Sequence, residues 1–185
     1  SIMTADGPAG LRISGECSMN TTAWPCATLL ACTWNPALVQ QVGQAGAEEV
    51  KENNLAVWLT PAVNIHRNPL CGRNFEYYSE DPYVAGTIAA AMTNGVQSNY
   101  GCGTTIKHFA CNNQEDNRMG SDSVISERTL REVYLKGFEI AVRESQPLSI
   151  MTSYNLINGV HAANNYDLCT ETARNEWGFK GMIMT

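Results

Sequence analysis

The sequence has no long apolar run, and basic residues are scarce in it. Its longest uncharged stretch, residues 17–47, is interrupted by prolines, asparagines and glutamines, so it lacks the roughly 20 apolar residues of a membrane span. Twelve Lys and Arg residues stand against 18 Asp and Glu, which gives a net charge of -6, and no basic cluster is present to follow a phosphate backbone. These absences argue against a membrane protein and against nucleic acid as a partner.

Cysteine pairs, metal-binding spacings and nucleotide-binding motifs are also missing. The seven cysteines are scattered without a Cys-x-x-Cys pair, and their odd number is typical of free thiols in a reducing compartment, which predicts a cytoplasmic location. The three histidines, His66, His108 and His161, lack the spacing of a zinc site. No glycine-rich phosphate-binding motif follows a predicted strand. We therefore expect neither a metal nor a cofactor.

What the sequence does contain is an alternation of apolar runs and amphipathic stretches. It predicts strands over residues 27–34, 56–64, 103–110, 148–155 and 181–185, and helices over residues 35–53, 83–98, 126–141 and 166–178. Asn35 with Pro36, and Ser126, have the residue types of helix N-termini. Strands that alternate with helices predict a parallel sheet with crossover helices.

Such a sheet is either open and doubly wound or closed as a barrel. Polar residues follow the predicted strands repeatedly, in "NIHR", "KHF" and "SYN", and catalytic groups at several strand ends are typical of the TIM barrel. We predict an α/β fold, a partial TIM-type (β/α)8 barrel that is incomplete at both ends, because about five strands are visible where eight are required. The chain also stops within the apolar "GMIMT" and starts without methionine, so we expect residues 1–185 to be an internal piece of one barrel domain.

Two loop motifs carry candidate binding residues. In "DGPAGLR", Asp6 precedes Gly7 and Pro8, and it either stabilises a local turn or binds a ligand. In "GRNFEYYSEDP", Arg73 suits bidentate binding of a ligand or a carboxylate. An ion pair explains part of this acidic motif, and Ser79, Glu80 and Asp81 have the character of a helix entry.

Two strand ends carry further candidates. Lys107 and His108 end a strand that should be buried on both faces, where a charge needs a partner or a ligand unless the lysine reaches the rim. Met151 and Tyr154 end the next strand and either face a ligand or line the core. Asp6, Arg73, Lys107 and His108 together favour a sugar, whose hydroxyls both donate and accept hydrogen bonds. Lys107 alone also permits an aldolase-type Schiff base, which leaves Asp6 and Arg73 without a role.

Six motifs in order resemble the N-terminal barrel of glycoside hydrolase family 3, in its β-glucosidase branch. They are "DGPAGLR", "NIHRNPLCGRNFEYYSEDP", "IKHFACNNQE", "SERTLREVYLKGFEIAV", "MTSYNLINGV" and "EWGFKGMIMT". The resemblance implies a retaining exo-β-glycosidase acting on an oligosaccharide or aryl β-glucoside. It also implies that the terminal sugar is bound by Asp6, Arg73, Lys107, His108, Arg118, Met151 and Tyr154.

The catalytic carboxylates implied by the resemblance are not in this sequence. The nucleophile of the family is an aspartate in a "GFxGxxxSDW"-like motif, and "GFKGMIMT" ends at Thr185, directly before that position. The acid/base is a glutamate in a following α/β sandwich domain. β-Xylosidase and a non-catalytic sugar-binding relative remain alternatives. "KHFACNNQED" departs from the "KHFPGHG"-like pattern of the family's β-N-acetylglucosaminidases, which disfavours that activity.

Overall fold

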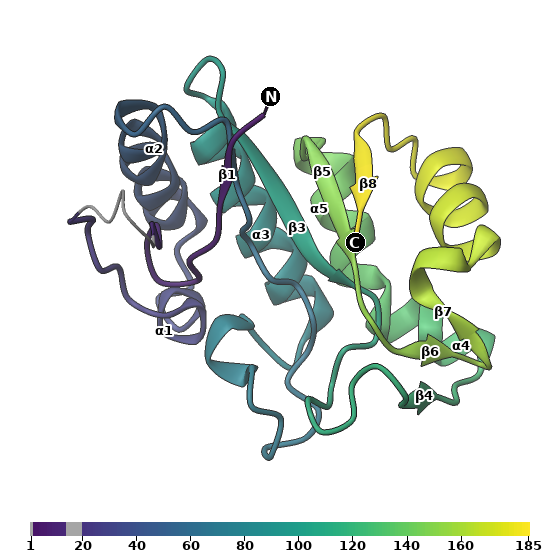
Figure 1. Ribbon diagram of the computed structural model, residues 1–185. Helices are drawn as coiled ribbons and strands as arrows, with labels where there is room; N and C mark the ends of the chain where they lie inside the picture. Colours follow the sequence, from purple (N-terminus) through teal and green to yellow (C-terminus); the bar gives the residue numbers. More distant parts are fainter. Residues whose placement is uncertain (1, 14–19) are drawn as a thin grey trace.

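A five-stranded parallel sheet forms the centre of the protein. The computed structural model describes residues 2–13 and 20–185. The strands lie in the order β1-β2-β3-β5-β8, with bounds Thr4–Ala5, Val57–Trp58, Gly103–Phe109, Ser149–Thr152 and Met182–Met184 (Figure 1). Every neighbouring pair in this sheet is parallel. A small second sheet, β4-β6-β7, is formed by Asp122–Ser123, Leu156–Ile157 and Val160–His161.

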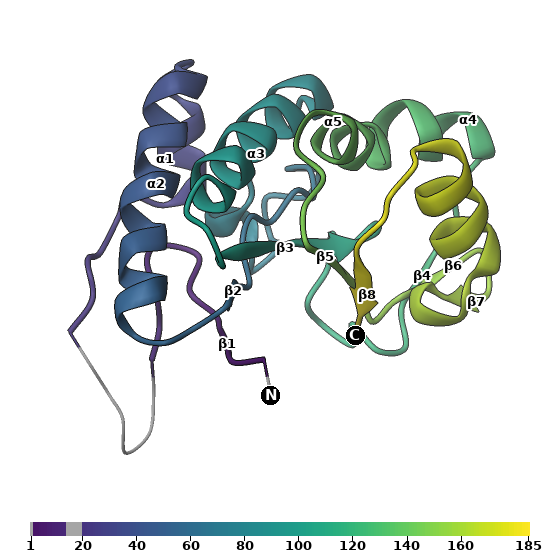
Figure 2. The same ribbon diagram turned by 90° about the horizontal axis from the view of Figure 1, so that it is seen from above.

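The helices follow one another in an arc on one side of the main sheet (Figure 2). The longer ones are α2, α3, α5 and the π-helical η4, with bounds Pro36–Glu52, Pro82–Gln97, Lys136–Ser145 and Asp167–Glu176. The short ones are α1, η1, α4, η2 and η3, with bounds Ala27–Ala31, Asn74–Glu76, Glu127–Thr129, Leu130–Tyr134 and Ala162–Asn164. Helices on one face distinguish a barrel wall from a doubly wound sheet, so the fold is an incomplete TIM-type barrel.

The first predicted strand is wrong. Residues 27–34 form helix α1 and a turn, and the first strand of the sheet is the two-residue β1, which precedes them. The apolar run "ATLLA" consists mainly of Ala and Leu, which favour helices, and its buried residues Ala27, Leu30 and Ala31 follow helical spacing. A two-residue strand next to a turn offers too short a pattern for sequence reasoning to detect.

The predicted helix starts are confirmed. Asn35 accepts a hydrogen bond from the Leu38 N–H at 3.1 Å, and Pro36 is the first residue of α2. Asp81 accepts from the Tyr83 N–H at 2.7 Å at the start of α3. Ser126 caps the predicted helix 126–141, which the structure divides into α4, the π-helical η2 and α5.

Strand β3 is the most deeply buried element of the sheet. All seven of its residues are buried, and it lies between β2 and β5. Phe109 at its end packs against Phe138 of α5 and Trp177 after η4, with ring centroids 5.1 and 5.7 Å apart. These contacts fix the helices to the sheet, so the end of β3 is a rigid support for side chains. Within the described residues, no helix is both long and apolar enough to cross a bilayer.

Candidate functional site

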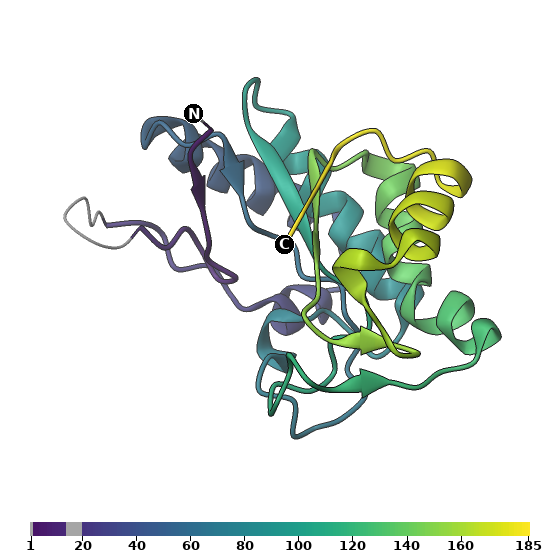
Figure 3. The ribbon, with the colours of Figure 1, turned by 45° about the vertical axis from the view of Figure 1, so that its right-hand side comes forward.

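The predicted site residues lie at or near one edge of the sheet. The carboxyl ends of the parallel strands meet there, toward the bottom of Figure 1, and Figure 3 shows the same edge from a second side. Asp6 follows β1, Arg73 lies in the loop after β2, Lys107 and His108 are in β3, and Tyr154 lies just after β5. Arg118 lies in the loop after β3, and Met151 is inside β5. Thr185 directly follows β8.

An ion pair between Asp6 and Lys107 joins the ends of β1 and β3. Lys107 is 2% exposed, and its Nζ donates to Asp6 Oδ1 at 2.7 Å. The Gly7 N–H donates to the same oxygen at 2.8 Å, and Arg12 Nη2 donates to Oδ2 at 3.0 Å. Burial by itself would raise the pKa of Asp6. The hydrogen bonds and charges of Lys107, Gly7 and Arg12 together lower it by more, so the pKa falls below the ordinary value. Asp6 therefore takes part in a local turn and also carries an ionised carboxylate into the site.

Glu76 is a buried carboxylate between two cations. It is 2% exposed and accepts a hydrogen bond from Arg73 Nε, while its Oε2 lies 3.7 Å from Lys107 Nζ. That oxygen has no hydrogen-bond partner among the described residues. Burial lowers the pKa of Arg73, but Glu76, Tyr77 and Glu115 together raise it more, so the net shift is upward and the guanidinium stays charged. The ion pair expected in this acidic motif therefore forms between Arg73 and Glu76, at i, i+3 spacing.

His108 is held as a neutral side chain. Its backbone N–H donates to Asn64 Oδ1 at 2.7 Å, and Asn64 Nδ2 donates to the His108 carbonyl at 2.9 Å. Burial lowers the pKa of His108 well below 6.5, and the positive charges of Arg73, Lys107 and Arg118 lower it further. The imidazole is therefore neutral at pH 7, and it can donate one hydrogen bond and accept another. Sequence reasoning did not identify Asn64.

Arg118 and Tyr154 form a second part of the site. Arg118 Nη1 donates to Glu115 Oε2 at 2.9 Å, and its guanidinium carbon lies 4.9 Å from the centre of the Tyr154 ring. The second contact is a cation–π interaction, which holds a charged and an aromatic group together. A cavity of about 300 Å³ opens beside them and is lined by Met119, Ser153, Tyr154, His161, Ala163, Asn164 and Thr185.

Met151 is the predicted site residue that the structure does not join to the others. It is partly buried within β5 and pairs with Met184 of β8. None of its described hydrogen bonds or ring contacts reaches the charged cluster formed by Asp6, Arg73, Glu76, Lys107 and His108, which we call the strand-end cluster.

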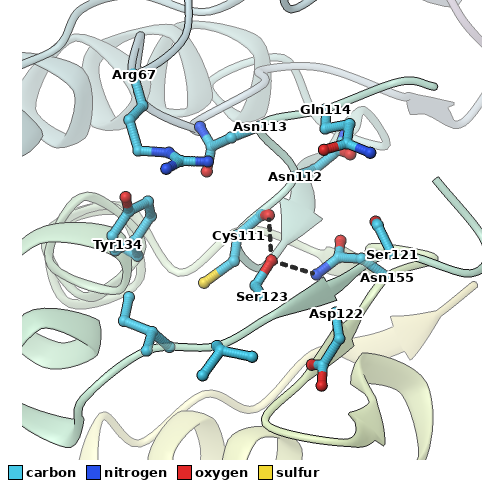
Figure 4. Close-up of a pocket in the computed structure, with 12 residues that line it drawn as sticks. Arg67, Cys111, Asn112, Asn113, Gln114, Ser121, Asp122, Ser123, Tyr134 and Asn155 are labelled. Atoms are coloured by element: carbon cyan, nitrogen blue, oxygen red, sulfur yellow. Dashed lines mark hydrogen bonds between the residues drawn. The ribbon is translucent and has the colours of Figure 1, made fainter. Parts of the chain in front are cut away.

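A second cavity lies apart from the seven predicted residues. It has a volume of about 330 Å³ and is lined by Arg67, Cys111, Asn112, Asn113, Gln114, Ser121, Asp122, Ser123, Val124, Ile125, Tyr134 and Asn155. Figure 4 shows Arg67 and Tyr134 on one side of it and Asp122 at the far end. Burial raises the pKa of the Cys111 thiol to about 12, which keeps it protonated and unreactive. No group of three or more metal-binding side chains occurs among the described residues.

The strand-end cluster and its support define a class of protein. A parallel sheet with one layer of helices, and charged donors and acceptors at the carboxyl ends of its strands, is the arrangement of a (β/α)8-barrel enzyme domain. The sequence matches the glycosyl hydrolase family 3 N terminal domain over residues 4–185. The chain belongs to this family.

Individual relatives agree with this assignment. The chain is 58% identical to β-glucosidase A of Butyrivibrio fibrisolvens and 51% identical to an exo-α-(1→6)-L-arabinopyranosidase of Bifidobacterium breve, over 98% and 99% of its own length. The structure of β-glucosidase 3B from Thermotoga neapolitana in complex with glucose is 54% identical and superposes over 99% of this chain with a TM-score of 0.95. The chain covers 22%, 25% and 26% of these three proteins, so it spans about a quarter of their length.

Proposed function

We propose that the protein containing this chain is a retaining exo-β-glycosidase that removes terminal, non-reducing β-D-glucosyl residues, and that this chain binds the terminal sugar. The observation that carries the proposal is the strand-end cluster, in which Asp6, Lys107 and Arg73 are charged and His108 is neutral at one sheet edge. The name of β-glucosidase A and the glucose in the Thermotoga neapolitana complex support this substrate class.

Each group in the cluster has a role that fits a sugar. The Asp6 carboxylate would accept hydrogen bonds from two neighbouring hydroxyls, while Lys107, Arg73 and His108 would donate to others. Such bonds to charged groups contribute about 1.5 to 3 kcal/mol each. We further propose that Arg118 and Tyr154 form the boundary of the sugar site on the side of β5, where the 300 Å³ cavity opens. Met151 would line the sugar site on the same side as Arg118 and Tyr154.

The reaction itself requires two carboxyl groups about 5 to 5.5 Å apart. We propose that the nucleophile is an aspartate that directly follows Thr185, at the carboxyl end of β8, and that the acid/base is a glutamate of a second domain. At the same sheet edge as Lys107 and Arg73, an aspartate there would remain ionised and ready to attack the anomeric carbon. The acid/base glutamate would be protonated when it meets the leaving group.

A second substrate class is favoured by one specific observation. The Bifidobacterium breve relative, at 51% identity, is named an exo-α-(1→6)-L-arabinopyranosidase, and an arabinopyranoside lacks the hydroxymethyl group of glucose. β-Xylosides share that property. The choice among these sugars depends on the space beside the sixth carbon, for which the wall near Tyr154 is one candidate boundary.

An aldolase-type reaction is disfavoured by the geometry of Lys107. A Schiff base requires a free amine, whereas Lys107 Nζ is engaged with Asp6 and lies beside Glu76. Borohydride treatment with a carbonyl substrate should therefore trap no adduct on Lys107.

The test uses the complete protein that contains residues 1–185. Aryl β-D-glucoside, β-D-xyloside and α-L-arabinopyranoside are compared by kcat/KM, and a 2-deoxy-2-fluoro glucoside is used to label the nucleophile for mass spectrometry. We expect the glucoside to be the best substrate and the label to lie on the residue after Thr185. Glucose binding without turnover of any glycoside would favour a sugar-binding relative instead, and labelling at another residue would contradict the proposed mechanism.

A further inference from the structure

The two halves of the candidate site are supported in different ways. Asp6, Lys107, Glu76 and Arg73 are linked directly by ion pairs. His108 and Arg118 have no such direct link to each other in the described structure. His108 lies at the rigid end of β3, whereas Arg118 lies in the loop that follows it. Some other group must therefore set their relative position.

Asn112 donates hydrogen bonds to two side chains that contact these residues, one beside His108 and one beside Arg118. Its Nδ2 donates to the hydroxyl of Tyr77 at 2.9 Å and to Glu115 Oε1 at 2.9 Å, so the two hydrogens of one amide have two different acceptors. The Tyr77 hydroxyl lies 3.5 Å from His108 Nδ1, and Glu115 Oε2 is the acceptor of Arg118. Asn112 is 5% exposed and Tyr77 is fully buried, which excludes water as an easy substitute for these bonds.

The direction of the Asn112 bond favours one of the two tautomers of His108. Since Asn112 donates to the Tyr77 oxygen, the hydrogen of that hydroxyl is available to His108 Nδ1. Burial raises the pKa of Tyr77 far above 10, so this hydrogen is retained. His108 is neutral, and a neutral imidazole that accepts at Nδ1 carries its hydrogen on Nε2. In the tautomer that this arrangement favours, Nε2 is the donor.

We propose that Asn112 is a positioning residue that fixes the tautomer of His108 through Tyr77 and the orientation of Arg118 through Glu115. This rests on the proposed function insofar as His108 and Arg118 contact the sugar. An amide that only satisfied buried groups would make the same number of bonds without affecting two separate site residues.

The neighbouring Asn113 provides a matched control. It is also 5% exposed, but its Nδ2 donates to the backbone carbonyl of Ile65 at 2.7 Å. Both asparagines line the Figure 4 cavity, so Asn112→Ala and Asn113→Ala remove the same group from the same environment. Only the first removes a contact that leads to His108 and Arg118.

The experiment measures both variants in the complete protein. We expect Asn112→Ala to lower kcat/KM for the aryl β-glucoside by roughly tenfold to hundredfold, as for other groups that orient functional side chains, and Asn113→Ala to change it by about twofold or less at a similar Tm. Equal losses in the two variants, or a normal kcat/KM in Asn112→Ala, would overturn the proposal.

The two branches are separated by further variants. If Asn112 acts through Tyr77 and Glu115, Tyr77→Phe should lower kcat/KM less in the Asn112→Ala variant than it does in the wild type. The same should hold for Glu115→Gln. Full additivity in both combinations would contradict the coupling.

A spectroscopic measurement is independent of catalysis. In protein labelled with 15N-histidine, with His108 assigned by comparison with His108→Gln, the wild type should show the Nε2–H tautomer. Tyr77→Phe removes a donor to the neutral ring, so the pKa of His108 should rise while Arg73, Lys107 and Arg118 still oppose protonation. A His108 spectrum unchanged in both Asn112→Ala and Tyr77→Phe would overturn the proposal. If the wild type hydrolyses no glycoside, the proposed function fails and this spectrum still decides the role of Asn112.

Discussion

Ion pairs occur in two contrasting regions of this protein. In the strand-end cluster, the side chains of Lys107 and Glu76 are 2% and 1% exposed and lie among other charges. On the helical surface around α4, those of Arg128 and Glu132 are 84% and 60% exposed and form an ordinary i, i+4 pair. Pairs of a basic residue and a glutamate are therefore placed in two very different solvent environments.

The contrast separates buried charges from hydrated ones. Removing a charged group from water is unfavourable unless partners replace its hydration, and buried ion pairs often stabilise a protein no better than apolar residues would. An exposed pair contributes between nothing and about 1 kcal/mol. The strand-end cluster is thus better explained by ligand binding than by stability, and variants of both regions can test this.

Lys107→Met should have the largest effect. It removes a buried cation from between Asp6 and Glu76, so among the described residues Glu76 keeps an ion pair with Arg73 alone. We expect the free energy of unfolding to fall by about 3 kcal/mol and activity on aryl β-glucosides to be lost. Urea unfolding and kinetics on the complete protein measure both. A stable, active Lys107→Met would place the cluster in the same category as the surface pairs.

Asp6→Asn should affect binding more than folding. The amide oxygen can still accept from the Gly7 N–H, which preserves the turn, but the negative charge that faces Lys107 and Arg12 is lost. Transition-state stabilisation should fall by ~2 to 4 kcal/mol, read from kcat/KM. Normal kinetics would show that Asp6 serves the turn alone.

His108 predicts a pH dependence of stability. Because its pKa in the folded protein lies well below 6.5, the unfolded chain takes up a proton as the pH falls through 6.5 while the folded protein does not. The free energy of unfolding should therefore decrease below pH 6.5, by at most about 1.4 kcal/mol per pH unit, and be unaffected by this group above it. Urea titrations of wild type and His108→Gln between pH 5 and 8 measure the difference. An identical pH profile in both would contradict the neutral, buried state.

Arg128→Ala should have the smallest effect. Its partner Glu132 is well hydrated, so loss of the pair should change the free energy of unfolding by less than about 0.5 kcal/mol and leave kcat/KM unaltered. The comparison fails if this surface variant is as damaging as Asp6→Asn.

Local patterns predicted much of the fold. The caps Asn35, Asp81 and Ser126 are short-range devices, and they marked helix starts correctly. The predicted strand at residues 103–110 also matches β3. The run at residues 27–34 was misassigned because a short apolar segment has no period that separates a strand from a buried helix.

The site was predictable only in part, because its contacts are long-range. Asp6 and Lys107 were both candidates, yet their ion pair joins positions 101 residues apart. Tyr77 and Asn112 escaped notice because neither stands out as a charged group and their bond forms only when the loops after β2 and β3 meet. Residue types thus indicated the chemistry, while the geometry came from the parallel sheet.

The order of strands also has a practical consequence for handling this segment. β1 and β8 are the outer strands of the sheet, and β8 is the apolar "MIM" of Met182–Met184. The backbone N–H and C=O groups on the outer side of such a strand can pair with another chain. Material consisting of residues 1–185 alone should consequently form intermolecular β-structure at high concentration, detectable as growing light scattering and thioflavin fluorescence. A lysine on this outer strand, introduced as Met182→Lys, should delay its onset.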